Sequence, residues 1–237
     1  SVGRHGYYST RSSIDLSFFL TQEEQRLRWM SERHKVTGEA ERKRREIYQR
    51  AARIFCEKSF EGASMQEVAN AVGLTKAGLY HYVGSKEQLL FEIMNYGMDI
   101  LDEAVLSRVA QIEDPMEKLK QTIAGHIHLI VHTRDLETTV VLHENRTVRG
   151  PLRKKINARK RAYIEYLEGL VFEVQKGESG PMVSPRLAAY ALLGMINWLY
   201  QWYDPNGPIK EEELACAFTQ IFLGGLRNPA PITQSTP

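Results

Sequence analysis

A short stretch in the first half of the chain, "GLTKAGLYHYVGSKEQLL" at 73–90, gathers side chains that can contact a nucleic acid. If a helix begins at Thr75, its outward face carries the hydroxyl of Thr75, the ammonium of Lys76, the phenol of Tyr80 and the imidazole of His81. Groups of these kinds form hydrogen bonds with phosphate oxygens and base edges. The stretch therefore predicts a surface that binds DNA.

Two further residues of the stretch fit the same chemistry. Gly78 lacks a side chain and so allows a close approach to a sugar-phosphate backbone or a base edge, at a helix-propensity cost of about 1 kcal/mol relative to alanine. Lys86 lies in the first turn of the next helix, where an ammonium and free backbone amides together suit a phosphate. Leu79 and Tyr82 are expected to turn inward and hold the helix on its neighbours.

Helix start and stop signals mark the elements that position these residues. "SMQE" is a capping box, in which Ser64 and Glu67 satisfy each other's backbone amides, and it begins a short helix that stops at Gly73. "SKEQ", from Ser85, is a second capping box and predicts a long helix over 86–110. Two short helices joined by a tight turn are typical of a helix-turn-helix, although two packed helices without a DNA-binding role fit the same pattern.

The rest of the chain also has a helical pattern. From Glu39 onward, apolar residues recur at helical spacing, and the later segments run roughly 15–25 residues between breaks rich in proline and glycine. The one β-branched run, "TTVVLH", is short. We therefore expect an all-α protein.

Composition narrows the class of protein. A net charge of +2 over 237 residues gives no general attraction to nucleic acids, so DNA binding must depend on local clusters. The two cysteines, Cys56 and Cys216, lie in apolar helical patterns and are expected to be buried free thiols of a reducing compartment. No apolar run approaches the ~18 residues of a membrane span, and no cleavable signal is visible. We expect a cytoplasmic protein without membrane contact.

Residues 47–93, "IYQRAARIFCEKSFEGASMQEVANAVGLTKAGLYHYVGSKEQLLFEI", resemble the N-terminal DNA-binding domain of the tetracycline-repressor-like (TetR/AcrR) family. The resemblance implies an all-helical homodimer, in which each subunit has a three-helix helix-turn-helix head and a larger helical body that binds ligand and dimerises. Three positions, Ser59, Val83 and Gly84, depart from the family pattern, in which glycine, phenylalanine and a polar residue or proline are usual. The DNA-binding residues that we expect are Ser64, Thr75, Lys76, Gly78, Tyr80, His81 and Lys86.

The resemblance also suggests limits for the domains. An N-terminal extension, flexible or partly helical, is expected over 1–38, and the helix-turn-helix DNA-binding domain over 39–84. The ligand-binding and dimerisation domain is expected over 85–228, followed by a flexible tail over 229–237.

A basic run in the body is the first candidate for a ligand site. Residues 146–161 hold eight basic side chains and no acidic one. Such a run fits a solvated helix face or a site for a polyanion such as the phosphates of coenzyme A, and a second DNA contact is a further alternative. The candidate coenzyme A contacts are Arg146, Arg149, Arg153 and Arg159.

A later segment, "LAAYALLGMINWLYQWYDPNG", is apolar almost all round and must be buried against a core, a partner subunit or a bound lipid. The helices 186–203 and 210–226 resemble the last two helices of the family, which pair as a four-helix dimer interface. The stretch from "HENR" to "IFLGGL" is similar to the subgroup that is released from DNA by acyl-CoA thioesters of fatty-acid or sterol breakdown. Trp198 and Trp202 are expected in an acyl pocket or in the interface, and packing in the core is the alternative.

Two classes of effector other than an acyl-CoA also fit the sequence. A hydrophobic drug or small molecule is one alternative to the acyl-CoA. A metal is another, because His128 and His132 are one helical turn apart, with His143 and Glu144 downstream. We expect no metal site and no cofactor, since no Asp or Cys stands at matching spacing on that helix.

The chain lacks the motifs of common enzymes, including G-x-S-x-G, the P-loop, G-x-G-x-x-G and HExxH. We therefore expect a transcriptional repressor and not an enzyme. Its dimer would bind a palindromic double-stranded DNA operator, with recognition helices about 34–36 Å apart if the half-sites are one helical turn apart. A small-molecule effector would move the long helix 86–110, which joins body and head, and change that spacing.

Overall fold

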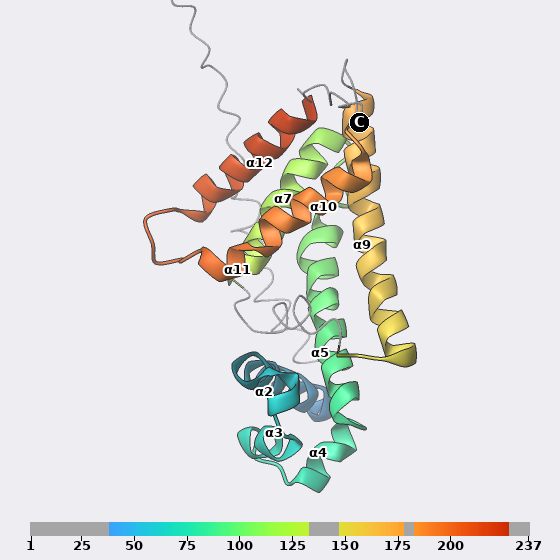
Figure 1. Ribbon diagram of the computed structural model, residues 1–237, viewed down its shortest axis with the longest axis vertical. Coiled ribbons are helices and arrows are strands. Elements are labelled where there is room, and N and C mark those ends of the chain that lie inside the picture. Colours follow the sequence, from blue (N-terminus) through green and yellow to red (C-terminus); the bar gives the residue numbers. More distant parts are fainter. Residues whose placement is uncertain (1–37, 133–146, 178–182, 228–237) are drawn as a thin grey trace, which may run out of the picture.

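The computed structural model describes residues 38–132, 147–177 and 183–227, and every regular element within these ranges is a helix. A small head (α2, α3, α4) lies at one end of the molecule, and the body lies at the other (Figure 1). The prediction of an all-α fold is confirmed, whereas the expected domain limits stay predictions. The elements are α2 (Glu39–Gly62), α3 (Met65–Ala71), α4 (Lys76–Tyr82), α5 (Lys86–Leu101), η1 (Asp102–Leu106), α6 (Ser107–Val109), α7 (Pro115–His132), α9 (Gly150–Lys176), α10 (Pro185–Asn197), α11 (Leu199–Trp202) and α12 (Glu211–Arg227).

The head is built on the apolar face of α2. Ile47, Ala51 and Phe55 recur at helical spacing and are almost fully buried. The helix bends near its end because Ser59 has φ 61° and ψ 163°, which are not helical values. After the bend, the ring of Phe60 packs edge-on against that of Phe55, with 5.3 Å between the ring centroids.

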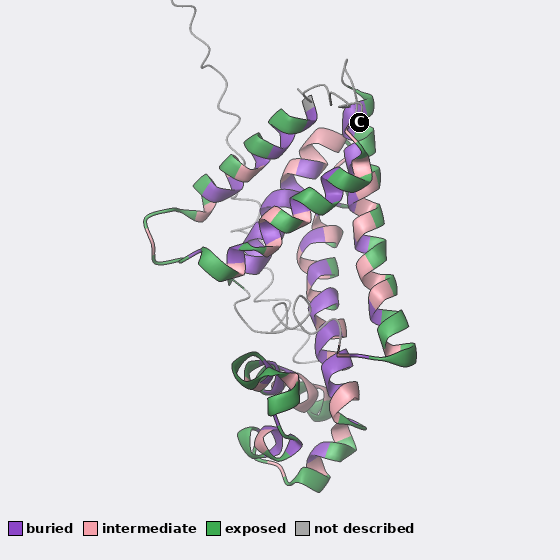
Figure 2. Ribbon diagram, in the orientation of Figure 1, coloured by how far each residue is buried: buried purple, intermediate pink, exposed green. Residues whose placement is uncertain are grey.

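The helix α5 runs from the head into the body and is buried along most of its length (Figures 1 and 2). It continues through η1, a π-helical turn, into α6. In this widened turn the hydroxyl of Ser107 donates to the carbonyl oxygens of Asp102 and Glu103, each at 2.9 Å. The predicted long helix is therefore present as a continuous run from Lys86 to Val109, with a wide turn inside it that the sequence pattern did not predict.

The body is a helical bundle around α7, whose residues 121–131 are all buried. Helix α9 packs against α5, α7 and α10, and α12 packs against α7. Because α5 contacts both α2 in the head and α9 in the body, it links the two parts mechanically.

The structure also bears on what the sequence predicts for the two cysteines and for membrane-spanning segments. Neither cysteine is in a disulfide, as expected, but neither is buried: Cys56 is exposed on the outer side of α2, and Cys216 of α12 is only half-buried. Among the described residues, no helix has the length and apolar character needed to span a bilayer.

Candidate nucleic-acid interface and effector-binding body

The predicted capping box at the start of α3 is confirmed. The amide of Glu67 donates to the Ser64 hydroxyl at 3.2 Å, and the amide of Ser64 donates to the Glu67 carboxylate at 2.8 Å. The ammonium of Lys58 also forms an ion pair with this carboxylate. Hydrogen bonds from Lys58, and then from Ser64, lower the pKa of Glu67 to about 2. The carboxylate that caps α3 is therefore ionised at neutral pH.

The turn between α3 and α4 depends on a glycine. Gly73 has φ +67°, a conformation that side chains other than glycine rarely adopt, and the amide of the following Leu74 donates to the carbonyl of Ala69 at 2.9 Å. The chain reverses directly into α4, whose first amides are capped by Thr75: the amide of Gly78 donates to its hydroxyl at 2.9 Å.

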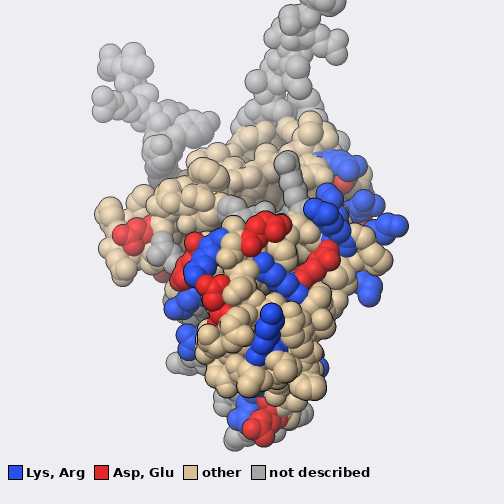
Figure 3. All heavy atoms as spheres, turned by 60° about the horizontal axis from the view of Figure 1, so that its bottom comes forward, with Lys and Arg blue, Asp and Glu red and all other residues tan. Residues whose placement is uncertain are grey.

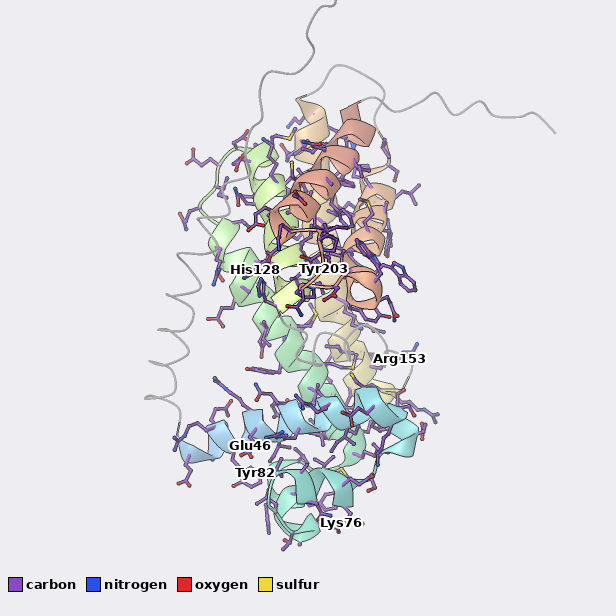
Figure 4. All side chains as sticks on the ribbon, turned by 90° about the vertical axis from the view of Figure 1, so that its left-hand side faces the viewer. Glu46, Lys76, Tyr82, His128, Arg153 and Tyr203 are labelled. Atoms are coloured by element: carbon purple, nitrogen blue, oxygen red, sulfur yellow. The ribbon has the colours of Figure 1, made fainter. Side chains whose placement is uncertain are left out.

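Helix α4 presents the outward surface expected from the sequence. Leu79 is completely buried, whereas Lys76, Tyr80 and His81 are exposed, and Tyr80 is one of the large apolar side chains that stay on the surface. Lys76 lies at the end of the head farthest from the body (Figure 4). The recognition residues therefore form one accessible face, although their role in DNA binding stays a prediction.

Gly78 has a local structural role as well as its predicted one. A Cβ atom at this position would lie 3.1 Å from the Thr75 hydroxyl, which is the acceptor of the cap. A side chain at residue 78 would therefore require the capping hydroxyl of Thr75 to shift by a few tenths of an ångström, even without DNA.

The start of α5 is capped differently from the prediction. The amide of Gln88 donates to the hydroxyl of Ser85 at 3.0 Å, but the Gln88 side chain donates to Glu92 at 2.6 Å instead of returning to Ser85. The second capping box is thus only half formed. Beside it, the ammonium of Lys86 lies 4.4 Å from the centroid of the Phe60 ring, a cation–π contact that holds the charge next to the first turn of α5.

The arginines predicted to contact an anion fall into different environments. Arg146 lies outside the described residues. Arg149 and Arg153 are exposed, whereas Arg159 is held by α5. Its guanidinium bonds Asp99 at 2.7 Å and Asp102 at 2.5 Å, and it also donates to Asn95 at 2.8 Å. Arg159 therefore joins the two helices, a role that sequence reasoning missed.

Most of the remaining basic side chains are exposed along the head-proximal part of α9 and are called here the basic stripe, whereas Lys160 is half-buried and is not one of them. The amide of Arg149 donates to the Glu87 carboxylate at 2.7 Å, which places the start of α9 beside the first turns of α5. Blue side chains gather on the right of Figure 3, the side on which α9 lies. Within the described ranges, the members of the stripe form no ion pair with an acidic residue; they are Arg149, Arg153, Lys154, Lys155 and Arg161.

A buried polar pair lies between α7 and α9. The hydroxyl of Tyr163 lies 3.0 Å from Nδ1 of His126, and the rings meet edge-on. Burial lowers the pKa of His126 to about 4 and raises that of Tyr163. At neutral pH the imidazole is therefore uncharged, and its Nδ1 shares one hydrogen bond with the phenol.

The two tryptophans do not lie in the core of the single chain. Trp198, at the break between α10 and α11, is 61% exposed, and Trp202, at the end of α11, is 46% exposed. Other large apolar side chains of α10 and α12 are exposed as well, and both helices have an outer face that is mostly exposed (green) in Figure 2. These side chains are Leu187, Tyr190 and Ile221. This surface, called here the apolar face, fits an interface better than an internal acyl pocket.

The histidine pair of α7 has an acidic partner that sequence spacing could not identify. Nδ1 of His128 lies 2.8 Å from one carboxylate oxygen of Glu211, and Nε2 of His132 lies 2.6 Å from the other. Burial tends to raise the pKa of Glu211, but the bonds to both imidazoles outweigh it and lower the pKa to about 2. The downstream residues His143 and Glu144, also considered from the sequence, lie outside the described residues.

Comparison with known proteins matches both parts of the chain. Residues 47–93 match the family described as bacterial regulatory proteins, tetR family, and residues 113–226 match the tetracyclin repressor-like C-terminal domain.

Two solved structures and one curated relative are similar over most of their lengths. AibR, solved in complex with isovaleryl coenzyme A and operator DNA, is 42% identical; the match covers 76% of this chain and 97% of that one, with a TM-score of 0.71. The TetR family transcriptional regulator PfmR from Thermus thermophilus is 32% identical, with coverages of 77% and 99% and a TM-score of 0.67. The transcriptional repressor KstR2 of Mycobacterium tuberculosis is 23% identical over 81% of this chain and 96% of its own length.

Proposed function

The chain belongs to the tetR family of bacterial regulatory proteins and is a DNA-binding transcription regulator, not an enzyme; from this premise we propose that it is a dimeric repressor of a palindromic operator. We also propose that an acyl-CoA thioester controls its affinity for DNA. The observation that carries the first proposal is the outward face of α4, on which Lys76, Tyr80 and His81 are exposed while Leu79 anchors the helix.

In the proposed complex, each subunit places α4 in a major groove. Lys76, Tyr80 and His81 contact bases or phosphates, and Thr75 and Ser64 contribute hydroxyls from the helix starts. Lys86, held next to the first turn of α5 by its contact with Phe60, binds a phosphate together with the free amides of that turn.

The apolar face of α10–α12 supports the dimer. An exposed patch that contains Trp198, Trp202 and Tyr190 is unusual for a monomer in water and favours burial against an identical patch. Trp198→Glu should convert the dimer to a monomer in sedimentation equilibrium, whereas Phe172→Glu, a substitution of another exposed ring, on α9, should leave the dimer intact. A wild-type protein that sediments as a monomer at micromolar concentration would contradict this proposal.

The charge of α9 and the similarity to AibR support an acyl-CoA thioester as the effector. The basic stripe of α9 has no acidic partners among the described residues, so its charges are available to the phosphates of coenzyme A. AibR was solved with isovaleryl coenzyme A. We propose Arg149 and Arg153 as phosphate contacts, together with Arg146, and we assign Arg159 to the joint between α9 and α5.

The direction of the response is part of the test, because the AibR complex contains both the thioester and operator DNA. A duplex is first selected from random DNA with the full-length protein. Fluorescence anisotropy then measures affinity for that duplex with no ligand, with free coenzyme A, and with isovaleryl or long-chain acyl-CoA. A change in affinity caused by a thioester and not by free coenzyme A supports the proposal in either direction, and the sign tells whether the effector releases or recruits the protein. If the protein binds a palindromic duplex tightly and no thioester changes the affinity, the proposal of an acyl-CoA effector is refuted and that of a repressor is kept. Hydrophobic small molecules would then be tested as effectors.

Variants test the recognition face separately. Lys76→Ala and Tyr80→Ala should each weaken DNA binding by roughly 5- to 150-fold, the effect of losing about 1–3 kcal/mol of contact. Lys176→Ala, at the far end of α9, is the matched control and should leave the affinity unchanged. Melting temperatures of all three should stay close to that of the wild type, because the side chains are exposed. Unchanged DNA affinity in both head variants would refute the docking of α4.

A further inference from the structure

We propose that His128, His132 and Glu211 form a binding site for one divalent transition-metal ion, best matched by zinc, in the body of each chain. The site lies away from the recognition face and the basic stripe, so it does not depend on the DNA or effector roles proposed above. Figure 4 shows His128 in the body, at a distance from Lys76 of the head.

The three side chains converge from two helices. His128 and His132 are one turn apart on α7, with 4.3 Å between their ring centroids, and Glu211 is the first residue of α12. One ligand atom from each residue can be chosen so that all of them lie within 4.8 Å of one another. The packing of α12 against α7 fixes this convergence, because it joins segments about 80 residues apart in the chain.

The spacing is close to that of a tetrahedral site. Zinc binds imidazole nitrogen at about 2.0–2.1 Å and carboxylate oxygen at about 2.0–2.2 Å, so neighbouring ligand atoms are about 3.3–3.5 Å apart. The present separations between Glu211 oxygens and imidazole nitrogens, 2.8 and 2.6 Å, are shorter than that. The full set of three ligand atoms lies within 4.8 Å, which is wider than that. Admitting the ion therefore needs side-chain adjustments of about 1–1.5 Å, with the oxygens of Glu211 moving away from the imidazoles and the imidazole nitrogens closing on the ion.

The donor set decides which ions fit. Two imidazoles with one carboxylate are typical ligands of zinc, cobalt or nickel, whereas magnesium and calcium prefer sites made only of oxygen. Three protein ligands leave the fourth position of a tetrahedral ion to water or another donor. His132 is exposed at the surface, which gives an ion a route to the buried His128.

The electrostatic setting also favours a cation. The amino end of a helix carries partial positive charge, which opposes a cation, but the first turn of α12 contains three carboxylates: those of Glu211, Glu212 and Glu213. These charges outweigh the effect of the helix end. A bound ion would tie the start of α12, and therefore one edge of the apolar face, to α7.

Zinc binding by the full-length protein tests the site. Protein freed of metal with a chelator is titrated with zinc in competition with a chromogenic zinc indicator, in a Cys56→Ser background that removes the exposed thiol. We expect one zinc ion per chain. Cobalt added in place of zinc should give the visible spectrum of a tetrahedral ion, without the charge-transfer band of a thiolate ligand.

Matched variants connect the binding to the three residues. His132→Gln and Glu211→Gln should each weaken zinc binding by more than about 100-fold, since losing a ligand costs more than losing a residue that orients one. Glu212→Gln removes the neighbouring carboxylate and should keep the affinity within a few-fold of wild type. Because His132 is exposed, its variant should fold normally, which circular dichroism checks.

Either of two results would overturn the proposal. Zinc binding that persists at wild-type affinity in both His132→Gln and Glu211→Gln would place the ion elsewhere. Failure of the wild-type protein to bind zinc at micromolar concentration would show that the three residues form only a hydrogen-bonded cluster of a carboxylate and two imidazoles.

Discussion

Lowering the pH from about 7.5 to about 5 should destabilise the protein by about 2 kcal/mol through one buried imidazole, that of His126. Burial lowers the pKa of this group from 6.5 to about 4 in the folded state. Below pH ~6.5 the unfolded chain therefore takes up a proton that the folded chain does not, and stability falls with pH. The stability that depends on the neutral imidazole is fully present above the pKa of His126 in the unfolded chain. It is lost as the pH falls toward the pKa of His126 in the folded chain.

The magnitude follows from the two pKa values. One pKa unit corresponds to about 1.4 kcal/mol, so the lowering from 6.5 to about 4 limits the loss to about 3 kcal/mol at low pH. At about pH 5 the unfolded imidazole is almost fully protonated while the folded one is mostly neutral, and about 2 kcal/mol of that limit is lost.

Urea unfolding at the two pH values measures this effect, with His126→Gln as the comparison. Glutamine cannot take up the proton but keeps an oxygen that can accept from the Tyr163 hydroxyl. The wild type should lose about 2 kcal/mol more than His126→Gln between about pH 7.5 and 5. Tyr163→Phe removes the hydrogen bond and leaves His126 buried, so it should keep the wild-type pH dependence. Equal pH dependence in the wild type and His126→Gln would refute the reasoning.

Three further substitutions test local features of the fold by urea unfolding. Ser59→Gly should raise the free energy of unfolding by about 1–2 kcal/mol, because φ 61° with ψ 163° is a conformation natural to glycine. Ser59→Ala should give no gain. If alanine stabilised the protein as much as glycine does, the explanation from the backbone conformation would be contradicted. Arg159→Met should lower the free energy of unfolding by only about 1 kcal/mol, because both aspartate partners are half-exposed and water weakens the ion pairs. Arg161→Met, which breaks no ion pair, should leave the stability unchanged. Equal losses in the two variants would show that the pairs with Asp99 and Asp102 contribute nothing. Ser64→Ala should cost about 1 kcal/mol through loss of the cap on α3, and an unchanged midpoint would mean that the capping box does not stabilise that helix.

Features that depend on near neighbours in the sequence could be predicted from the sequence. The Ser64 cap and the buried Leu79 follow from spacings of three to four residues, which helix geometry converts directly into contacts. The same kind of argument was less successful at Gln88, because its side chain has two helical neighbours to choose from and bonds Glu92 instead of the backbone of Ser85. A local pattern shows which hydrogen bonds a side chain can reach. Which of them forms depends on the other partners within reach of the same side chain.

Features that depend on packing between distant segments could not be predicted. Arg159 meets its aspartates across 57–60 residues of chain, and Glu211 meets the histidine pair across 79–83, so no spacing rule connects them. For the two tryptophans the sequence left three environments open, an acyl pocket, an interface and the core, for a different reason. A helix that is apolar all round must be covered, but its composition does not tell whether the cover comes from the same chain or from another.

The π-helical turn Asp102–Leu106 sets the angular position of the head. Such a turn takes up one residue more than the same length of α-helix, and one residue corresponds to about 100° of rotation about the helix axis. Everything on the head side, including α4, is therefore turned about the axis of α5 by roughly that angle relative to an uninterrupted helix. Arg159 binds Asp102, the first residue of this turn, from the body. A chain with one residue fewer at this point would keep both its head and its body folded, but would aim its recognition helix in a different direction.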